Sequence, residues 1–229
     1  MNNTNNKRIA IIGGGYSGLS AAHTFIKRGY SVQIYEAAPF LGGLASTFNI
    51  GNSVVEKFYH HLFLSDNYLI DLLEEFNLKS HIIWKNSSTS YFHNGRIYPF
   101  TTPIDLLKFS PVNFINRIRM GLLALYLQRV KNWKKYEKIT AAEYMKKYAG
   151  SQNYKIIWEP LLKGKFSDYY QDVSMSWLWS KFATRVASRD RNFQEKLGYI
   201  DGSWNLLTDA LATFITKHNS KIDLNTRVS

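Results

Sequence analysis

The chain has 229 residues, of which 45% are hydrophobic and 15% aromatic, and this is enough apolar side chain for a packed core. It contains no cysteine, which excludes disulfides, zinc–thiolate sites, iron–sulfur clusters, thiol nucleophiles and any cysteine-linked cofactor. The formal net charge of +12 suits nucleic acid, anionic substrates, an anionic membrane surface or simply a solvated basic surface. The sequence holds no zinc-finger or RNA-recognition motif, so nucleic acid is not an expected partner.

The first predicted elements form a strand–helix–strand unit. An apolar run at 9–12 predicts a buried strand, a helix is expected at 19–28, and a second apolar strand at 31–35. A glycine at 29 ends the helix, and Glu36 follows the second strand directly. This is the arrangement of a βαβ unit with an acid at its far end.

Three glycines between the first strand and the helix follow the pattern G-x-G-x-x-G. Gly13 allows a tight turn, Gly15 gives the backbone room to approach a pyrophosphate, and Gly18 lets the helix pack near the sheet. The helix N-terminus then directs free N–H groups at the phosphates. Glu36 is placed to accept hydrogen bonds from a ribose 2′-OH and to repel a 2′-phosphate. The pattern therefore predicts a dinucleotide site that disfavours NADP; the alternative is a glycine-rich turn without a ligand.

The residues after Glu36 extend the fingerprint to E-x-x-P-x-x-G-G-x-x-S, with Gly42 and Gly43 as the second glycine pair and Ser46 at its end. This extended pattern resembles the FAD-dependent amine oxidoreductase superfamily, and within it the branch of protoporphyrinogen oxidase, the carotenoid desaturases and UDP-galactopyranose mutase. The resemblance implies FAD as the cofactor, with the glycine pair beside its diphosphate and ribityl chain. Many amine oxidases carry Arg after the pair, and Leu44 at that place favours the desaturase and mutase side.

The same resemblance implies a set of FAD-binding residues and no metal site. The expected FAD-binding residues are Gly13, Gly15, Tyr16, Ser17, Gly18, Glu36, Ala37, Gly42, Gly43, Leu44, Ala45 and Val228. The candidate catalytic residues are His60 and His61, either of which could hydrogen-bond the flavin ring or act as an acid–base group near neutral pH. On a strand the two would face opposite ways, so at most one is expected to face the flavin. The alternative is one histidine in the core and one at the surface.

Further along the chain, a capped helix is expected at 68–76 and a strand at 82–84. Strands at 89–92 and 96–100 flank Asn94-Gly95, the strongest short hairpin signal. Two proline-led segments, at 102–103 and 110–111, each predict the start of a helix.

The segment 117–138 has an apolar centre flanked by basic residues and by Trp133 and Tyr136. Its apolar part is far shorter than the roughly 20 residues that a membrane span needs. Basic residues beside interfacial aromatics are typical of peripheral membrane contact, and the alternative is a buried helix with a solvated basic end.

The last third of the chain is predicted to be mostly helical. Thr140 and Glu143 form a capping-box pattern for a helix up to 148, and a helix at 175–185 carries Trp177 and Trp179. These tryptophans either wall an apolar substrate cavity or fill the core. A turn is expected at 197–204, a helix at 206–216 and a final strand at 221–228.

The resemblance implies an α/β fold in which a discontinuous, Rossmann-like FAD-binding domain of the GR2 type carries an inserted α+β substrate domain. The first part of the FAD-binding domain is expected at 1–64, the substrate domain at 65–197, and the return to the FAD-binding domain at 198–229. The resemblance covers nearly all of this chain but only the N-terminal half of the family's length. A truncated sequence is therefore expected, with a last FAD-binding motif in the missing part.

The expected function is that of an FAD-dependent oxidoreductase whose flavin accepts a hydride from an apolar or lipid-linked small molecule. One alternative is an isomerase resembling UDP-galactopyranose mutase, without net redox change; another is a non-catalytic FAD-binding or membrane-associated fragment. A truncated chain can be inactive alone. Residues 1–6 carry no apolar signal segment, so a cytoplasmic location is expected, with peripheral contact to the inner membrane face through 117–138.

Overall fold

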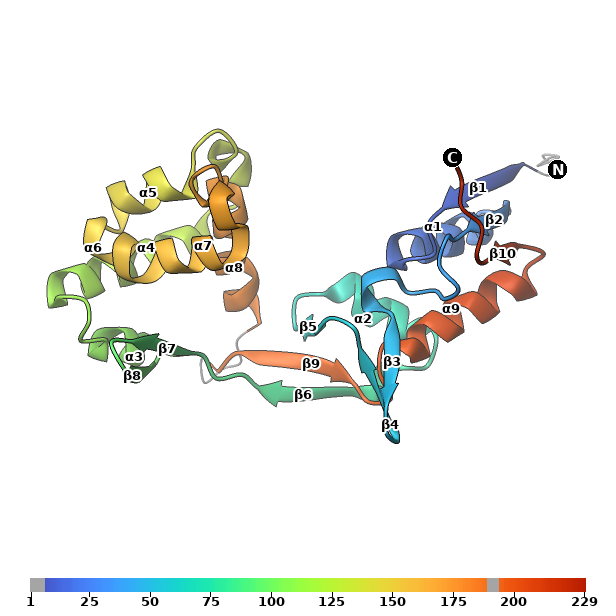
Figure 1. The fold of residues 1–229 in the computed structure, drawn as a ribbon, viewed down its shortest axis with the longest axis horizontal. Helices are drawn as coiled ribbons and strands as arrows, with labels where there is room; N and C mark the ends of the chain where they lie inside the picture. The colour runs from blue at the N-terminus through green and yellow to red at the C-terminus, as the bar shows by residue number, and fades with distance from the viewer. Residues whose placement is uncertain (1–6, 189–193) are drawn as a thin grey trace. The chain divides into compact units, whose positions relative to one another are not determined.

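The computed structural model describes residues 7–188 and 194–229, and the chain divides into two compact units (Figure 1). Unit 1 consists of Met1–Leu62, Asp66–Trp84 and Gly198–Ser229, and unit 2 of Phe63–Ser65 and Lys85–Leu197. Each unit has its own cluster of buried apolar side chains. This division differs from the expected domain boundaries in two segments. Residues 63–64 belong to unit 2, and residues 66–84 belong to unit 1, because Leu73 and its neighbours pack into the core of unit 1.

Unit 1 is built on a parallel three-stranded sheet in the order β1-β2-β10. The strands are β1 (Arg8–Ile12), β2 (Ser31–Tyr35) and β10 (Lys221–Asp223), and α1 (Tyr16–Lys27) connects the first two. Val32 and Ile34 of the central strand are fully or almost fully buried, as expected for a parallel sheet covered by helices. The predicted strand–helix–strand unit and the Rossmann-like α/β class are confirmed.

Helix α9 (Asn205–Lys217) lies beside α1 in unit 1 (Figure 1). Leu207, Leu211 and Ile215 repeat every four residues on one face and are completely buried, which matches the predicted helix. The predicted final strand was too long, since β10 ends at Asp223 and the chain continues without regular structure to Ser229. Asn225 takes a positive φ of 54°, a conformation that interrupts an extended strand.

The other elements of unit 1 include three strands whose residues are divided between unit 1 and unit 2, β5 (Leu62–Phe63), β6 (Ile82–Asn86) and β9 (Lys196–Ile200). The remaining elements are η1 (Gly43–Ala45), β3 (Thr47–Ile50), β4 (Ser53–Glu56), α2 (Asn67–Glu75) and η2 (Lys79–His81). The segment of β9 was expected to be a turn, and this prediction was wrong. A side chain at Gly198 would lie 2.9 Å from the ring of Trp84, so this glycine allows two strands to pack closely.

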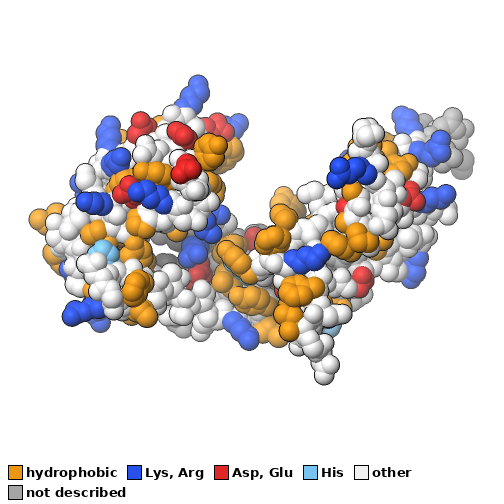
Figure 2. Space-filling view, in the orientation of Figure 1, with side chains coloured by type: hydrophobic (Ala, Val, Ile, Leu, Met, Phe, Trp, Pro, Cys, Tyr) orange, Lys and Arg blue, Asp and Glu red, His pale blue; other side chains and the backbone are white. Residues whose placement is uncertain are grey.

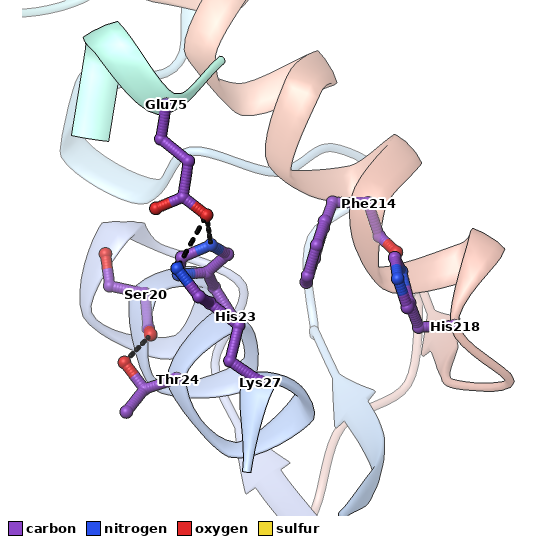
Figure 3. A network of polar contacts seen from close by, with 7 residues as sticks. All are labelled: Ser20, His23, Thr24, Lys27, Glu75, Phe214 and His218. Atoms are coloured by element: carbon purple, nitrogen blue, oxygen red, sulfur yellow. Dashed lines mark hydrogen bonds and ion pairs between the residues drawn. The ribbon is translucent and has the colours of Figure 1, made fainter. Parts of the chain in front are cut away.

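Helices α1 and α2 are joined by a small polar network (Figure 3). The Oε1 atom of Glu75 lies 3.0 Å from Nε2 of His23 and 2.8 Å from Nζ of Lys27. The ring of His23 also packs against Phe214 of α9, with ring centroids 4.8 Å apart. Glu75 thus accepts from two side chains of α1 at the edge of the apolar core.

Unit 2 is mostly helical, with one hairpin. Its elements are β7 (Ser90–His93), β8 (Arg96–Pro99), α3 (Pro103–Lys108), α4 (Phe114–Arg129), η3 (Trp133–Tyr136), α5 (Ala141–Tyr148), α6 (Ser151–Asn153), the π-helix η4 (Tyr154–Trp158), α7 (Glu159–Phe166), η5 (Ser167–Gln171) and α8 (Met175–Ala187). Asn94 and Gly95 both have positive φ at the hairpin turn, which confirms the predicted hairpin. The hydroxyl of Thr140 accepts from the N–H of Glu143, as predicted for the start of α5.

The segment 117–138 is divided between two elements, α4 and η3, and is not the single buried helix of the alternative interpretation. Asn113, whose side chain accepts from the N–H of Asn116, caps α4, and the helix ends before the extended residue Val130. The prediction that the segment at 110–111 starts a helix was therefore three residues too early. No helix among residues 7–188 and 194–229 is long and apolar enough to cross a membrane.

The tryptophans of α8 belong to the core of unit 2. Trp177 packs edge-on against Phe166, with ring centroids 4.8 Å apart, and the indole N–H of Trp179 donates to the carbonyl of Leu127. Of the two interpretations of this pair, the structure supports core packing.

Candidate functional site

The tight turn after β1 depends on two glycines. Gly13 has a φ of +102°, and its N–H donates to the carbonyl of Tyr35 over 2.8 Å. A Cβ atom on Gly18 would lie only 2.0 Å from the carbonyl oxygen of Gly13, so no other residue type fits there without movement of the backbone. The roles predicted for Gly13 as a turn residue and Gly18 as a close-packing residue agree with this geometry.

The N-terminus of α1 carries no cap from any side chain. Gly15 is its N-cap residue, and the first turn holds no acidic residue. The first N–H groups of a helix have no acceptor within the helix, and together they carry a partial positive charge. Ser17 is exposed in this turn, so its hydroxyl is open to solvent. This end of α1 is therefore suited to an anion such as a diphosphate.

The second glycine pair packs directly against the first glycine loop. The N–H of Gly42 donates to the carbonyl of Gly14 over 2.9 Å, and Gly42 and Gly43 both have positive φ. A Cβ atom on Gly43 would lie 3.1 Å from Cα of Gly15. A Cβ atom on Gly15 would meet Gly43 at an ordinary contact distance of 3.7 Å, so the close approach of the two loops depends on Gly43. The expectation that Gly15 leaves room for a pyrophosphate stays a prediction.

Glu36 ties the glycine loop to the end of β2. Its Oε2 atom accepts from the N–H of Gly14 over 2.6 Å, and its Oε1 atom accepts from the N–H of Ala38 over 2.7 Å. Each carboxylate oxygen has two lone pairs, so one remains on each for sugar hydroxyls. The backbone of Glu36 is also paired, because its carbonyl accepts from the N–H of Thr226. Glu36 thus organises the loop as well as presenting an acceptor.

Several of the predicted FAD-binding residues do not have their side chains available for a ligand. The side chain of Tyr16 points to α9, where its hydroxyl donates to the carbonyl of Trp204 over 2.7 Å. Burial raises the pKa of Tyr16 to about 12. Only the backbone N–H of Tyr16 is left for a ligand. Leu44 is 71% exposed, whereas Ala45 is buried in the core of unit 1.

Val228 and Ala37 lie in segments without regular structure. Val228 was expected near the end of a strand and is exposed beyond the end of β10. Ala37 is exposed and follows Glu36 directly. The N–H of Asn225 donates to the carbonyl of Ala38, so the C-terminal segment runs beside the residues that follow β2.

Ser46 is a site residue that the sequence analysis did not select. Its side chain is only 4% exposed, and its hydroxyl has no hydrogen-bond partner among the described residues. A Cβ atom on Gly42 would lie 3.3 Å from the Cα of Ser46, so the two residues are in close contact. A buried hydroxyl without a partner is costly, and a polar ligand beside the glycine pair would supply one. The signal was present as the serine that ends the extended fingerprint. The glycine loops, the uncapped helix and this hydroxyl together fit the phosphate end of a dinucleotide.

The two candidate histidines lie in the loop after β4, not on a strand. Nδ1 of His60 donates to the carbonyl of Phe58 over 2.7 Å, which leaves Nε2 as the acceptor nitrogen of the neutral ring. The ring of His61 stacks on that of Tyr59, with centroids 6.0 Å apart. They therefore have different neighbours, and both are half-buried. Within the described part of the chain, no group of three or more His, Asp or Glu side chains could hold a metal ion.

Comparison with known families gives one match that spans most of the chain. The family model for flavin containing amine oxidoreductases matches residues 16–229. In sequence, the chain is 23% identical over 177 residues to a provisionally named zeta-carotene desaturase of Synechococcus elongatus, a match that covers 67% of this chain and 37% of that protein.

Two solved structures illustrate the fold. A provisionally named protoporphyrinogen oxidase from Exiguobacterium sp. 255-15 has a TM-score of 0.66 and 20% identity, covering 97% of this chain and 53% of its own. A triple mutant of putrescine oxidase has a TM-score of 0.69 and 19% identity, covering 96% of this chain and 51% of its own. At such identities the likeness concerns the fold alone. The chain spans about half the length of these solved relatives.

Proposed function

Because the chain belongs to the family of flavin-containing amine oxidoreductases, we propose that it supplies the ADP-binding part of an FAD-dependent oxidoreductase. The observation that carries this proposal is the joint between the two glycine loops, where Gly42 pairs with Gly14 and Gly43 packs on Gly15. A site for NAD alone needs only the first loop. The second loop gives backbone room for the diphosphate of FAD and for the ribityl chain that follows it.

The residues of this chain have separate tasks in the proposed site. The free N–H groups of Tyr16, Ser17 and Gly18 bind the diphosphate at the positive end of α1. Glu36 accepts from the ribose hydroxyls while its other lone pairs hold the N–H groups of Gly14 and Ala38. When bound, FAD supplies a hydride acceptor at its N5 atom.

The proposed substrate is an apolar small molecule, which can be linked to a lipid. The support is indirect: the zeta-carotene desaturase and protoporphyrinogen oxidase among the relatives carry names of enzymes that act on apolar compounds. A chemical role for the histidines is also part of the proposal. In the neutral ring of His60, the hydrogen bond from Nδ1 to Phe58 leaves the lone pair on Nε2, and that nitrogen accepts a proton from the substrate.

The test is to load the protein with FAD and mix it anaerobically with candidate substrates while the flavin absorbance is recorded. Bleaching by a polyene or a porphyrinogen, but not by a short polar amine, is the expected result. Substitution of His60 by Gln should lower the bleaching rate, because the amide side chain cannot accept a proton from the substrate. His218→Gln is the matched control, because that ring binds a carbonyl of its own helix and is exposed.

The outcomes separate the alternatives. A flavin that binds but is bleached by none of the substrates contradicts the oxidoreductase proposal. Turnover of a sugar nucleotide by the chemically reduced protein, without net bleaching, would instead indicate a mutase. A folded protein that does not bind FAD would contradict both.

A further inference from the structure

Helix α4 in unit 2 is apolar on two sides. Met120, Leu123 and Leu127 on one side are buried in the core of unit 2. On the opposite side, an outer face is formed by Ile115, Ile118, Leu122, Leu125 and Tyr126, all of which are exposed. Ile115 is 78% exposed and Leu122 is 63% exposed. Their spacing of three and four residues places them on one continuous stripe along the helix.

The apolar surface continues beyond α4. Ile104 and Leu107 of the adjoining helix α3 are exposed, and so is Trp133 of η3. The segment η3 is held against the outer face, because Nζ of Lys135 donates to the hydroxyl of Tyr126 over 3.0 Å. An exposed apolar surface of this extent is uncommon on a monomer and indicates a binding surface.

The segments that carry this surface are rich in basic residues. The basic residues between 103 and 138 are Lys108, Arg117, Arg119, Arg129, Lys131, Lys134, Lys135 and Lys138, and the acidic residues are Asp105 and Glu137. Asp105 accepts from the N–H groups of Thr101 and Thr102 at the start of α3, so its charge is engaged there. On the face drawn in Figure 2, charged side chains of both signs lie among exposed apolar side chains of unit 2.

From this combination we infer that the outer face of α4 binds the surface of a membrane that contains anionic lipids. An exposed apolar stripe with lysines, arginines and a tryptophan at its border is the composition of a helix that lies in the interface plane. The helix has 16 residues, about 24 Å at 1.5 Å per residue, which is too short to span a bilayer but long enough to lie along one. This inference does not depend on FAD binding or on the proposed reaction.

Charge distinguishes this occupant from others. A second copy of unit 2 would bring a second set of lysines against the first, and like charges in contact oppose association. Anionic head groups meet the lysines with opposite charge, while the hydrocarbon boundary receives Ile115 and Leu122.

The test is co-sedimentation of the protein with vesicles of phosphatidylcholine, alone or mixed with phosphatidylglycerol. Binding is expected to the mixed vesicles, to weaken as salt is raised, and to be much weaker with phosphatidylcholine alone. The double variant Ile115→Gln/Leu122→Gln should bind about tenfold more weakly or worse. The matched control is Ile97→Gln on β8 of the same unit, where the side chain is 72% exposed.

A second variant tests the charge. Lys134→Gln should lower binding to the mixed vesicles by about fivefold, and Lys165→Gln on α7 should leave it unchanged. All substituted side chains are exposed, so circular dichroism should show the same fold in every variant. Equal binding by all variants, or no binding to the mixed vesicles, would overturn the inference. So would loss of a solution dimer in the double variant with lipid binding unchanged, because a second copy would then be the occupant.

Discussion

The surroundings of Gly18 make the strongest demand on a single residue in the described chain. The carbonyl of Gly13 stands where a Cβ atom would be, 2.0 Å away, and Ile11 lies behind it at 3.3 Å. We expect Gly18→Ala to lower the free energy of unfolding by about 1–3 kcal/mol, because the turn must open to admit the methyl group. Urea unfolding measures this change.

Gly164 in α7 is the matched control for that substitution. No atom lies within 4 Å of a Cβ built on it, so Gly164→Ala should raise the free energy of unfolding by about 0.5–1 kcal/mol. Equal effects of the two substitutions would show that the turn after β1 is not as tight as the structure indicates.

Tyr16 gives a prediction for alkaline pH. Burial raises its folded-state pKa to about 12, above the ordinary value of 10.0. The neutral side chain of Tyr16 therefore contributes its full stabilisation of the fold below pH 10. This contribution is lost as the pH rises toward 12, because the tyrosine ionises at a lower pH in the unfolded chain than in the folded one. Tyr16→Phe should remove part of this decline and lower stability at neutral pH by about 1 kcal/mol, through loss of the bond to Trp204.

The measurement for Tyr16 is urea unfolding at a series of pH values from neutral to strongly alkaline. Tyr68→Phe is the control, because Tyr68 is 94% exposed and should leave the curve unchanged. A Tyr16→Phe curve that falls as steeply as that of the unaltered chain would contradict this account.

Among the elements, the network between α1 and α2 explains why the segment after residue 65 packs in unit 1 (Figure 3). The hydrogen bond from Lys27, and then that from His23, lowers the pKa of Glu75 below its ordinary range. The ionised carboxylate of Glu75 therefore stabilises the fold at pH values above its ordinary pKa. This stabilisation is lost as the pH falls through the lowered pKa. Glu75→Gln should therefore cost more at neutral pH than in acid.

The expected cost of Glu75→Gln at neutral pH is about 1 kcal/mol, since the side chain is partly exposed and keeps one acceptor oxygen. Glu74→Gln is the neighbouring control: its partner Lys79 lies 2.8 Å away, but both side chains are more than half exposed. Thermal unfolding at neutral and acidic pH distinguishes them. A larger effect from Glu74 than from Glu75 would refute the structural role of the network.

The elements also show where sequence patterns were sufficient. The glycine spacing and apolar runs identified β1, α1 and β2, because all the contacts of this unit lie within one short stretch of sequence, with Arg8 paired to Ser31. Asn94-Gly95 identified the hairpin, because its turn is fixed by those two residues. Strand β9 was mistaken for a turn because a glycine such as Gly198 is typical of turns in sequence. In the structure this glycine is needed because the ring of Trp84, far away in the chain, packs against it. No helix end was predicted within 117–138, because both faces of α4 are apolar and periodicity does not mark its end at Arg129.

The candidate site was predictable to a similar extent. Gly13, Gly18, Gly42 and Gly43 have the special geometry that their pattern required. Ser46 was visible in the sequence as the end of the fingerprint, but only the structure shows that its buried hydroxyl has no partner among the described residues. The direction of the Tyr16 side chain depends on α9, which returns to this part of the fold almost two hundred residues later.

At the scale of the whole molecule, the chain covers about half of the length of its solved relatives yet contains both glycine loops of the fingerprint. In unit 1, β10 pairs with β2, and α9 packs against α1 in one buried apolar cluster. The residues of the fingerprint therefore lie on a folded core. Residues of this chain alone are therefore expected to bind the ADP part of FAD.

The most direct test is calorimetric titration of the protein with FAD, ADP and FMN in parallel. FAD and ADP are expected to bind to the same site and to compete, while FMN, which lacks the adenosine part, is expected not to bind. Glu36→Ala should weaken the binding of FAD and ADP by about tenfold or more, whereas Asp71→Ala, at an exposed position of α2, should not. Binding of FMN as tight as that of FAD, or no binding of either FAD or ADP by the folded protein, would contradict this expectation.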